Sequence, residues 1–397
     1  MLNRNTLRNI YKQDFENFFS YHKVKLRSKR IIPNPGEERY IPISRILEEE
    51  LKSGASFSKE ELDGFLYNEL FYSVNNWHYL YQLNDSNNAF KNNPESITAL
   101  LKSEPKFKFN NPLVNKLENE NFSLCTSRLE IIDNKVKVIN FLFKIGVVES
   151  NKENYTFFSG VTIDLERNFV YFRFNQNLLD NYPFDPLDVI SKLKDILNGL
   201  RSEGRFFEAL KFNIVGFNET IPKKIISTLF KDLSSEAEDI LNQQVPANTD
   251  KDIRDFLKGK KLPSHEDYVQ QIKSVIYQDI SQTCADTLFK NGWVFRFVFR
   301  EGQLTRAASR TDDKSPIYGS KVYWHLKELI FKNDEMQEAG FHWYLNDPTQ
   351  TDEPKFLQAR LEARHDSLII HYYYNMRTGD RKEKEDYVLQ KINGYFQ

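Results

Sequence analysis

The chain has 397 residues, enough for two or three domains at the usual size of roughly 100–200 residues each. Hydrophobic residues make up 40% of the chain and aromatic residues 14%, which is enough to build folded cores and excludes an intrinsically disordered protein. The formal net charge of −1 excludes a chain that is a polyelectrolyte as a whole.

Cysteine content and hydropathy predict the compartment. Cys125 and Cys284 are the two cysteines, too few for a disulfide framework, and we expect both as small buried groups. The N-terminus lacks the apolar stretch of a signal peptide, and no run of about 18 apolar residues predicts a transmembrane helix. We therefore expect a cytoplasmic protein that does not enter a membrane. The Asn-, Lys-, Ile- and Phe-rich composition is typical of an AT-rich bacterial genome.

Basic residues are concentrated at the N-terminus. Between residues 1 and 32, eight Lys or Arg against two acidic residues leave a net charge of +6. Basic and apolar residues alternate in YHKVKLRSKR, which predicts a strand with one basic face. Such a face either binds phosphates or keeps an exposed strand edge from pairing. The candidate nucleic-acid-binding residues of this arm are Lys23, Lys25, Arg27 and Arg30.

Residues 41–72 are predicted to form two helices. The second begins with a capping box, in which Ser58 accepts from the backbone N–H of Glu61 and Glu61 reaches back. A short turn between helices is typical of a helix-turn-helix DNA reader. However, four acidic side chains against Lys59 alone would repel a phosphate backbone, so we do not expect this helix to bind DNA.

The central region alternates between loop, strand and helix signals. Residues 84–121 are rich in Asn, Pro, Ser and Lys and are predicted as a loop or linker. Residues 122–175 are predicted as two hairpins that turn at 133–134 and 166–168. A helix over 185–200, with Pro186 at its start and Gly199 at its end, and a strand over 208–217 complete a β-meander with a covering helix.

The C-terminal part begins after a polar helical region at 221–262, and a helix is predicted over 264–290. A strand follows, in which Trp293, Phe295, Phe297 and Phe299 are expected to share one face and the arginines the other. Residues 356–374 are predicted as a second hairpin that turns at 364–366.

These elements predict an α+β fold, with a helical N-terminal region followed by two β-rich units, each with packed helices. We expect a helical N-terminal region with a basic arm at 1–105, a central β-meander with helices at 106–262, and a C-terminal helix with β-hairpins at 263–397.

The sequence lacks the motifs of several common chemistries. The sequence has neither a phosphate-binding P-loop nor a dinucleotide-binding glycine motif, and no zinc-ligand pair of the CxxC or HExxH type. Glu104 and Lys106 have the E-x-K spacing of metal-dependent nucleases, but Pro105 would interrupt the strand that such a site needs. Cys284 lies inside a predicted helix with no local partner for nucleophilic catalysis. We expect no cofactor, metal or catalytic residue.

A second basic segment follows the last domain boundary. Residues 291–332 carry eight basic and four acidic residues, a net charge of +4. The arginines of the 291–313 hairpin either line a phosphate path or form a solvated face whose charges pair with neighbours such as Glu362. The candidate nucleic-acid-binding residues here are Arg296, Arg300, Arg306 and Arg310.

The order of elements in residues 264–375 resembles that of YezG-type immunity proteins of bacterial polymorphic toxin systems. The resemblance rests on DISQTCADTLFKNGWVFRFVF, GFHWYLNDP and FLQARLEARHDSLIIHYYYN, and it covers about a quarter of the chain. It implies a non-catalytic domain that binds a partner protein.

Three hypotheses follow. The first is a non-enzymatic binding protein of a bacterial conflict system, either phage defence or toxin immunity, that acts through protein–protein contacts. The alternative is a nucleic-acid-binding component of an anti-phage defence system that uses the basic N-terminus and the 291–313 hairpin. The third is an enzyme whose carboxylates are dispersed along the sequence, which spacing does not exclude. The sequence leaves oligomerisation open.

Overall fold

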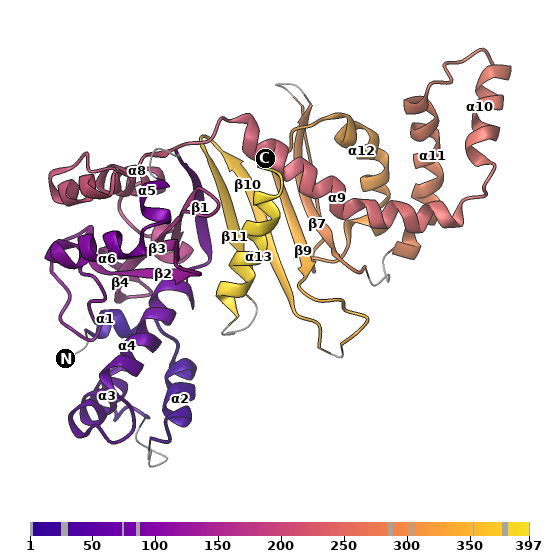
Figure 1. The fold of residues 1–397 in the computed structure, drawn as a ribbon. Coiled ribbons are helices and arrows are strands. Elements are labelled where there is room, and N and C mark those ends of the chain that lie inside the picture. Colours follow the sequence, from indigo (N-terminus) through magenta and orange to yellow (C-terminus); the bar gives the residue numbers. More distant parts are fainter. Residues whose placement is uncertain are drawn as a thin grey trace. The chain divides into compact units, whose positions relative to one another are not determined.

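A computed structural model gives the fold of the chain (Figure 1). The residues it describes are 3–24, 31–73, 75–84, 88–284, 289–301, 305–351, 353–374 and 380–396. Helices and antiparallel strands together confirm the predicted α+β fold. Backbone contacts divide the chain into two compact units: unit 1 comprises 1–216 and 375–381, and unit 2 comprises 217–374 and 382–397. The two units do not coincide with the three expected segments, because the N-terminal helices share a core with the central sheet.

Unit 1 is built on an antiparallel sheet in the order β2-β3-β4-β5-β1, with the short β6 paired to β1. Its first hairpin turns through Asp133 and Asn134, both at positive φ, which is the conformation that two-residue hairpin turns favour. The predicted hairpins at 133–134 and 166–168 are therefore confirmed. The strands are β1 (Trp77–Leu83), β2 (Ser123–Ile132), β3 (Lys135–Ser150), β4 (Glu153–Asp164), β5 (Phe169–Phe174) and β6 (Ile214–Val215).

Helices cover both faces of this sheet. On one face the N-terminal helices form a core with Leu142 and Phe158 of the sheet, and on the other the Phe207 ring lies 5.2 Å from that of Phe141. Both predicted helices of 41–72 form, and the capping box of Ser58 and Glu61 is confirmed. The helices are α1 (Arg4–Leu7), α2 (Lys12–Tyr21), α3 (Ile41–Ser53), α4 (Lys59–Asn68), a π-helical turn (Glu69–Ser73), α7 (Gln176–Asp180), α8 (Pro186–Leu197) and a 3-10 helix (Ser202–Leu210).

Residues 84–121 contain more structure than predicted. Helices α5 (Asn88–Lys91) and α6 (Pro94–Ser103) and a 3-10 turn (Pro105–Phe107) form within the expected loop. Asn93 caps α6 by accepting from the backbone N–H of Ser96 at 3.0 Å. The loop prediction was wrong here because the Asn and Pro that looked like turn residues form the start of a helix.

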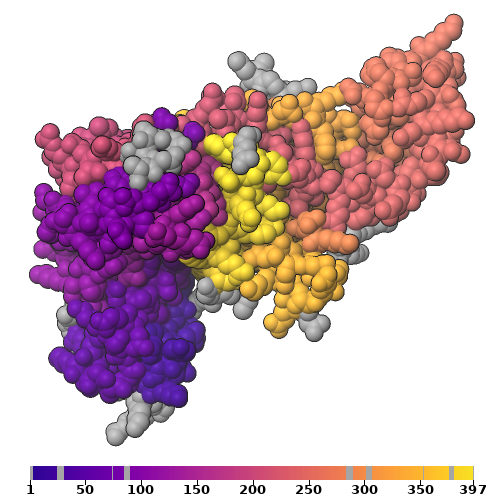
Figure 2. Space-filling view, in the orientation of Figure 1, coloured from indigo at the N-terminus to yellow at the C-terminus, as the bar shows by residue number. Residues whose placement is uncertain are grey.

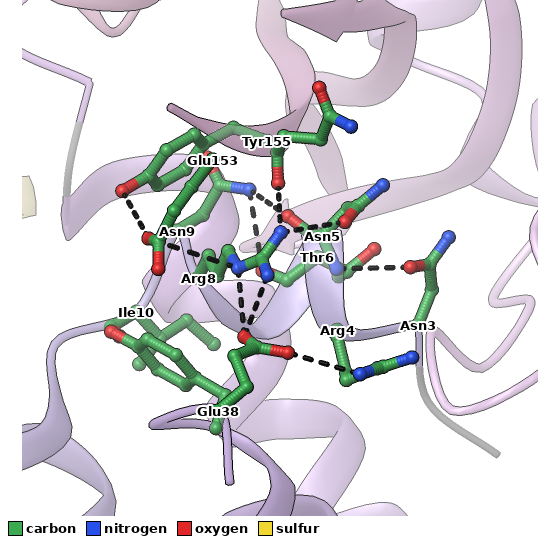
Figure 3. Close-up of polar contacts among 12 residues, drawn as sticks. Asn3, Arg4, Asn5, Thr6, Arg8, Asn9, Ile10, Glu38, Glu153 and Tyr155 are labelled. Atoms are coloured by element: carbon green, nitrogen blue, oxygen red, sulfur yellow. Dashed lines mark hydrogen bonds and ion pairs between the residues drawn. The ribbon is translucent and has the colours of Figure 1, made fainter. Parts of the chain in front are cut away.

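The N-terminal basic residues are used in anchoring α1 to strand β4 (Figure 3). Arg8 is central: its guanidinium lies 2.7 Å from a carboxylate oxygen of Glu38, and it donates to the carbonyl of Asn154 at 2.7 Å. Arg4 contacts the same Glu38 at 3.1 Å. Asn9 donates to the carbonyl of Thr156 on β4 at 2.9 Å. Arg4 and Arg8, two of the eight basic residues counted near the N-terminus, therefore serve contacts within the fold.

The strands of unit 2 pair antiparallel in the order β11-β10-β9-β7-β8, so β8 is an edge strand. The predicted hairpin of 356–374 is confirmed, with His365 at positive φ in its turn. The strands are β7 (Gly292–Glu301), β8 (Thr305–Arg310), β9 (Glu338–Tyr344), β10 (Phe356–Arg364) and β11 (Ser367–Tyr372).

Helices α9 and α13 pack on one face of the unit 2 sheet (Figure 1). Phe230 of α9 lies 5.8 Å from Phe297, and Tyr387 of α13 lies 6.5 Å from Trp343. Helices α10 and α11 pack on each other around a small core, and α11 also packs on α12, where the Tyr277 and Trp324 rings lie 5.1 Å apart (Figures 1 and 2). The helix predicted over 264–290 ends at residue 280. The helices are α9 (Thr220–Gln244), α10 (Thr249–Gly259), α11 (Glu266–Ile280), α12 (Lys321–Lys332) and α13 (Arg381–Asn393).

Candidate nucleic-acid interface

A β-bulge in β7 divides the aromatic residues that were expected to share one face. Val294 lies opposite Phe341 and Arg296 lies opposite Gly340, so Phe295 is an extra residue in β7. Phe297 remains on the α9 face, whereas Trp293 lies opposite His342 of β9. The prediction of a single aromatic face was therefore wrong, because one inserted residue reverses the side-chain alternation.

The extra residue lies over a glycine. A Cβ atom on Gly340 would fall 2.5 Å from the Phe295 ring, so only glycine leaves room for this ring. Phe295 also lies 6.0 Å from the ring of Tyr373. Trp293 and Phe295 are thereby placed on the sheet face opposite to α9, the face that also carries the arginines.

The four arginines predicted in the hairpin lie on one face in two cross-strand pairs. Arg296 of β7 is opposite Arg310 of β8, and Arg300 is opposite Arg306. Directly opposed residues of an antiparallel pair have Cβ atoms roughly 4.5–5.5 Å apart, and like charges at this distance destabilise the sheet. We call the surface formed by Arg296, Arg300, Arg306 and Arg310 the arginine face.

Ion pairing neutralises only part of the arginine face. Arg296 pairs with Glu338 of β9. Glu362, the expected cross-strand partner, instead contacts Arg364 of its own strand at 2.7 Å and Arg360 at 3.8 Å. The other three members of the face are exposed, and no carboxylate of the described residues pairs with them: they are Arg300, Arg306 and Arg310. A cluster of exposed cations with no carboxylate partner is suited to binding an anion.

Of the N-terminal candidates, Lys23 is the one that the structure describes. Lys23 belongs to unit 1 and lies exposed in a turn after α2, at a φ of 53°, which is not a strand conformation. Lys25, Arg27 and Arg30 lie outside the described residues. The expected basic strand is therefore absent at Lys23, and the arginine face is made of unit 2 residues.

An aromatic stack lies on the same sheet face as the arginines. The His342 ring lies 3.8 Å from that of Trp293 and 4.8 Å from that of Phe356, with interplanar angles of 10° and 12°. His342 is 5% exposed, whereas Phe356 is 38% exposed. Burial, together with the nearby charge of Lys314, lowers the pKa of His342 to about 4. His342 is therefore neutral at pH 7 and acts as a flat apolar ring.

Lys314 orients the polar edge of this stack. Its ammonium donates to the side-chain carbonyl of Gln358 at 3.1 Å, which turns the amide N–H of Gln358 toward Nδ1 of His342, also at 3.1 Å. Nδ1 then accepts, and the proton of the neutral ring resides on Nε2. No described residue accepts a hydrogen bond from this buried Nε2.

Other parts of the described structure offer weaker candidates. A cavity of about 790 Å³ in unit 1 is lined by lysines, glutamates, amides and apolar side chains, and its described lining includes neither His nor Cys. Glu104 caps a 3-10 turn by accepting from the backbone N–H of Lys106 at 3.0 Å. Burial raises the pKa of the Cys125 thiol to about 12, so it is not a nucleophile, and the side chain of Cys284 lies outside the described residues. Within the described ranges, no cluster of three or more His, Cys, Asp or Glu could hold a metal ion.

Part of this interface carries a sequence signal. The strand alternation of GFHWYLN places His342 and Trp343 on opposite faces, and Trp343 packs toward α13 as alternation requires. The bulge could not be predicted from the sequence, because phenylalanine is as common at regular strand positions as at Phe295.

Comparison with known proteins assigns no family. No family model, curated protein or solved structure matches the chain. In the described part of the chain, no helix is long and apolar enough to span a membrane. The resemblance of residues 264–375 to YezG-type immunity proteins stays a prediction.

Proposed function

We propose that the chain is a non-enzymatic binding protein and that the arginine face of unit 2 binds nucleic acid. The observation that supports this proposal is the arrangement of Arg300, Arg306 and Arg310: exposed, on one sheet face and without a carboxylate partner among the described residues. Arg300 and Arg306 oppose each other directly, which costs free energy in the unbound protein. A phosphate placed between them converts that repulsion into two charge-assisted contacts.

The spacing of the face also fits an extended polyanion. Arg296 and Arg300 are four residues apart on β7, which is about 13 Å at roughly 3.4 Å per residue. The guanidinium groups are planar forks that bind phosphate oxygens in pairs. One phosphate would not reach both ends of such a face, whereas successive phosphates of one strand would.

A structural role competes with this proposal. Charged side chains on an edge strand prevent unwanted pairing with other chains, and β8 is an edge strand. Edge protection requires charge on β8 but gives no reason for Arg300 of β7 to lie directly opposite Arg306. The expected protein partner and the bacterial conflict setting come from the sequence resemblance and composition, and they stay predictions.

Fluorescence anisotropy with a labelled oligonucleotide tests the proposal. We expect binding at about 50 mM salt that weakens steeply at about 200 mM, and weaker binding with a smaller salt dependence in the triple variant Arg300→Gln, Arg306→Gln, Arg310→Gln. Arg296 is kept, because its removal would leave the buried Glu338 without its partner. The control variant removes the same amount of charge elsewhere in unit 2. It carries Lys251→Gln and Lys258→Gln on α10 and Lys260→Gln directly after that helix. If labelled polyglutamate binds and oligonucleotides do not, the ligand is an acidic protein.

A further inference from the structure

We infer that the nucleic acid is single-stranded and that one of its bases stacks on Phe356, at the exposed end of the aromatic stack formed by Trp293, His342 and Phe356. The inference rests on the proposed function, because it names the ligand class of the same sheet face.

The stack and the arginine face are continuous. Trp293 and Arg296 lie opposite His342 and Gly340, which are two residues apart on β9 and therefore about 7 Å apart along the strand, and the bulge brings both to the same face. Across the sheet, Trp293 is opposite His342, and His342 is opposite Gln358 of β10. A strand whose phosphates contact the arginines would therefore have bases within reach of Phe356.

The exposure of Phe356 distinguishes it from a core residue. The aromatic residues on the α9 and α13 face of the same sheet are buried, with Phe341 at 0% and Trp343 at 2% exposure. Phe356 is 38% exposed and stacks nearly parallel to His342 on one side. A flat ring fixed in orientation by a parallel neighbour, with part of its surface open to solvent, is a base-stacking platform.

The charged surroundings of Phe356 favour an anionic ligand over an apolar one. Lys314 adds a cation 4.3 Å from the Tyr373 ring on this face. A nucleotide carries aromatic surface and negative charge together, which match the exposed ring of Phe356 and the cation of Lys314.

Base stacking selects single strands. In a duplex the π-faces of the bases are covered by their neighbours, whereas the bases of a single strand are free to stack on protein rings. The arginine face alone would not distinguish the two forms, because phosphates are common to both. Phe356 is therefore the residue on which discrimination depends.

The test compares single-stranded and duplex oligonucleotides of equal length with Phe356 variants. We expect Phe356→Ala and Phe356→Leu to weaken single-strand binding about fivefold or more, with the salt dependence unchanged because no phosphate contact is removed. Phe356→Trp should preserve affinity, and its added fluorescence should be quenched when oligo(dT) binds. Phe256→Ala, at a 57% exposed phenylalanine of α10, is the matched control and should leave affinity unchanged.

The outcomes separate this inference from the proposed function. If Phe356→Ala and Phe356→Leu bind single strands as tightly as the unsubstituted protein, while the triple arginine variant binds more weakly and with a lower salt slope, the stacking inference is wrong and the proposed function stands. Equal affinity for duplex and single strands would also overturn it. If the unsubstituted protein binds no oligonucleotide at about 50 mM salt, both proposals fail.

Discussion

The aromatic stack makes the stability of the protein depend on pH through His342. In the folded protein the pKa of His342 is lowered from 6.5 to about 4, because burial between Trp293 and Phe356 disfavours the charged ring and Lys314 adds repulsion. In the unfolded chain the ring titrates near its ordinary value. Between pH 6.5 and pH 4 the unfolded state therefore binds more protons than the folded state, and acid favours unfolding.

The magnitude follows from the size of the shift. A change from 6.5 to about 4 is about 2.5 pKa units, and each unit is worth roughly 1.4 kcal/mol. We expect the contribution of His342 to be complete above pH 6.5 and about 3 kcal/mol of folding stability to be lost by pH 4. This is a large part of the 5–15 kcal/mol that is typical of a folded domain.

Urea unfolding at several values between pH 7 and pH 4, followed by circular dichroism, measures this loss. The comparison is His342→Phe, which keeps a flat ring between Trp293 and Phe356 but cannot be protonated. The pKa of His371 is also lowered to about 4, by burial and by the nearby charges of Arg360 and Lys314. The pH dependence that His371 contributes is the same in both proteins. Between pH 7 and pH 4, the free energy of unfolding should fall by about 3 kcal/mol less in His342→Phe than in the unsubstituted protein. The same pH dependence in both proteins would refute the burial argument.

Three further substitutions test the geometry. Gly292→Ala should destabilise the protein by about 2 kcal/mol or more in urea unfolding, because Gly292 has a φ of +111° and a Cβ there would lie 1.9 Å from the carbonyl oxygen of His342. Gly340→Ala should cost about 1–3 kcal/mol by the same measurement, because it displaces the Phe295 ring, and a neutral effect would contradict the bulge. Arg8→Ala should lower the unfolding free energy by about 2 kcal/mol, and Arg8→Lys should recover only part of it, since the fork that contacts Glu38 is lost.

Local signals were sufficient to predict many of the elements. The Asp133-Asn134 turn, the capping box at Ser58 and the Pro-to-Gly limits of the helix at 186–199 all act within a few residues, and all three are present. The errors arose where one residue type is favoured both in loops and at the start of a helix. Asn93 and Pro94 looked like loop residues and instead begin α6.

The candidate site was predictable only in part, because its geometry depends on pairing between distant strands. Alternation correctly placed Arg296 and Arg300 together on one face, and it placed Arg306 and Arg310 on the return strand. The cross-strand opposition of these arginines depends on the hairpin register, and the position of Trp293 depends on a single inserted residue. Neither leaves a signal in local periodicity.

The measurement that tests the central claim most directly is the salt dependence of oligonucleotide binding with and without Arg300, Arg306 and Arg310. Each phosphate contact contributes about 0.7 to the slope of log affinity against log salt for a single strand, so three contacts contribute about 2. We expect the unsubstituted protein to bind with this slope or a steeper one, and the triple Gln variant to bind with a slope lower by about 2. Equal slopes and affinities in the two proteins would show that the arginine face does not contact phosphates.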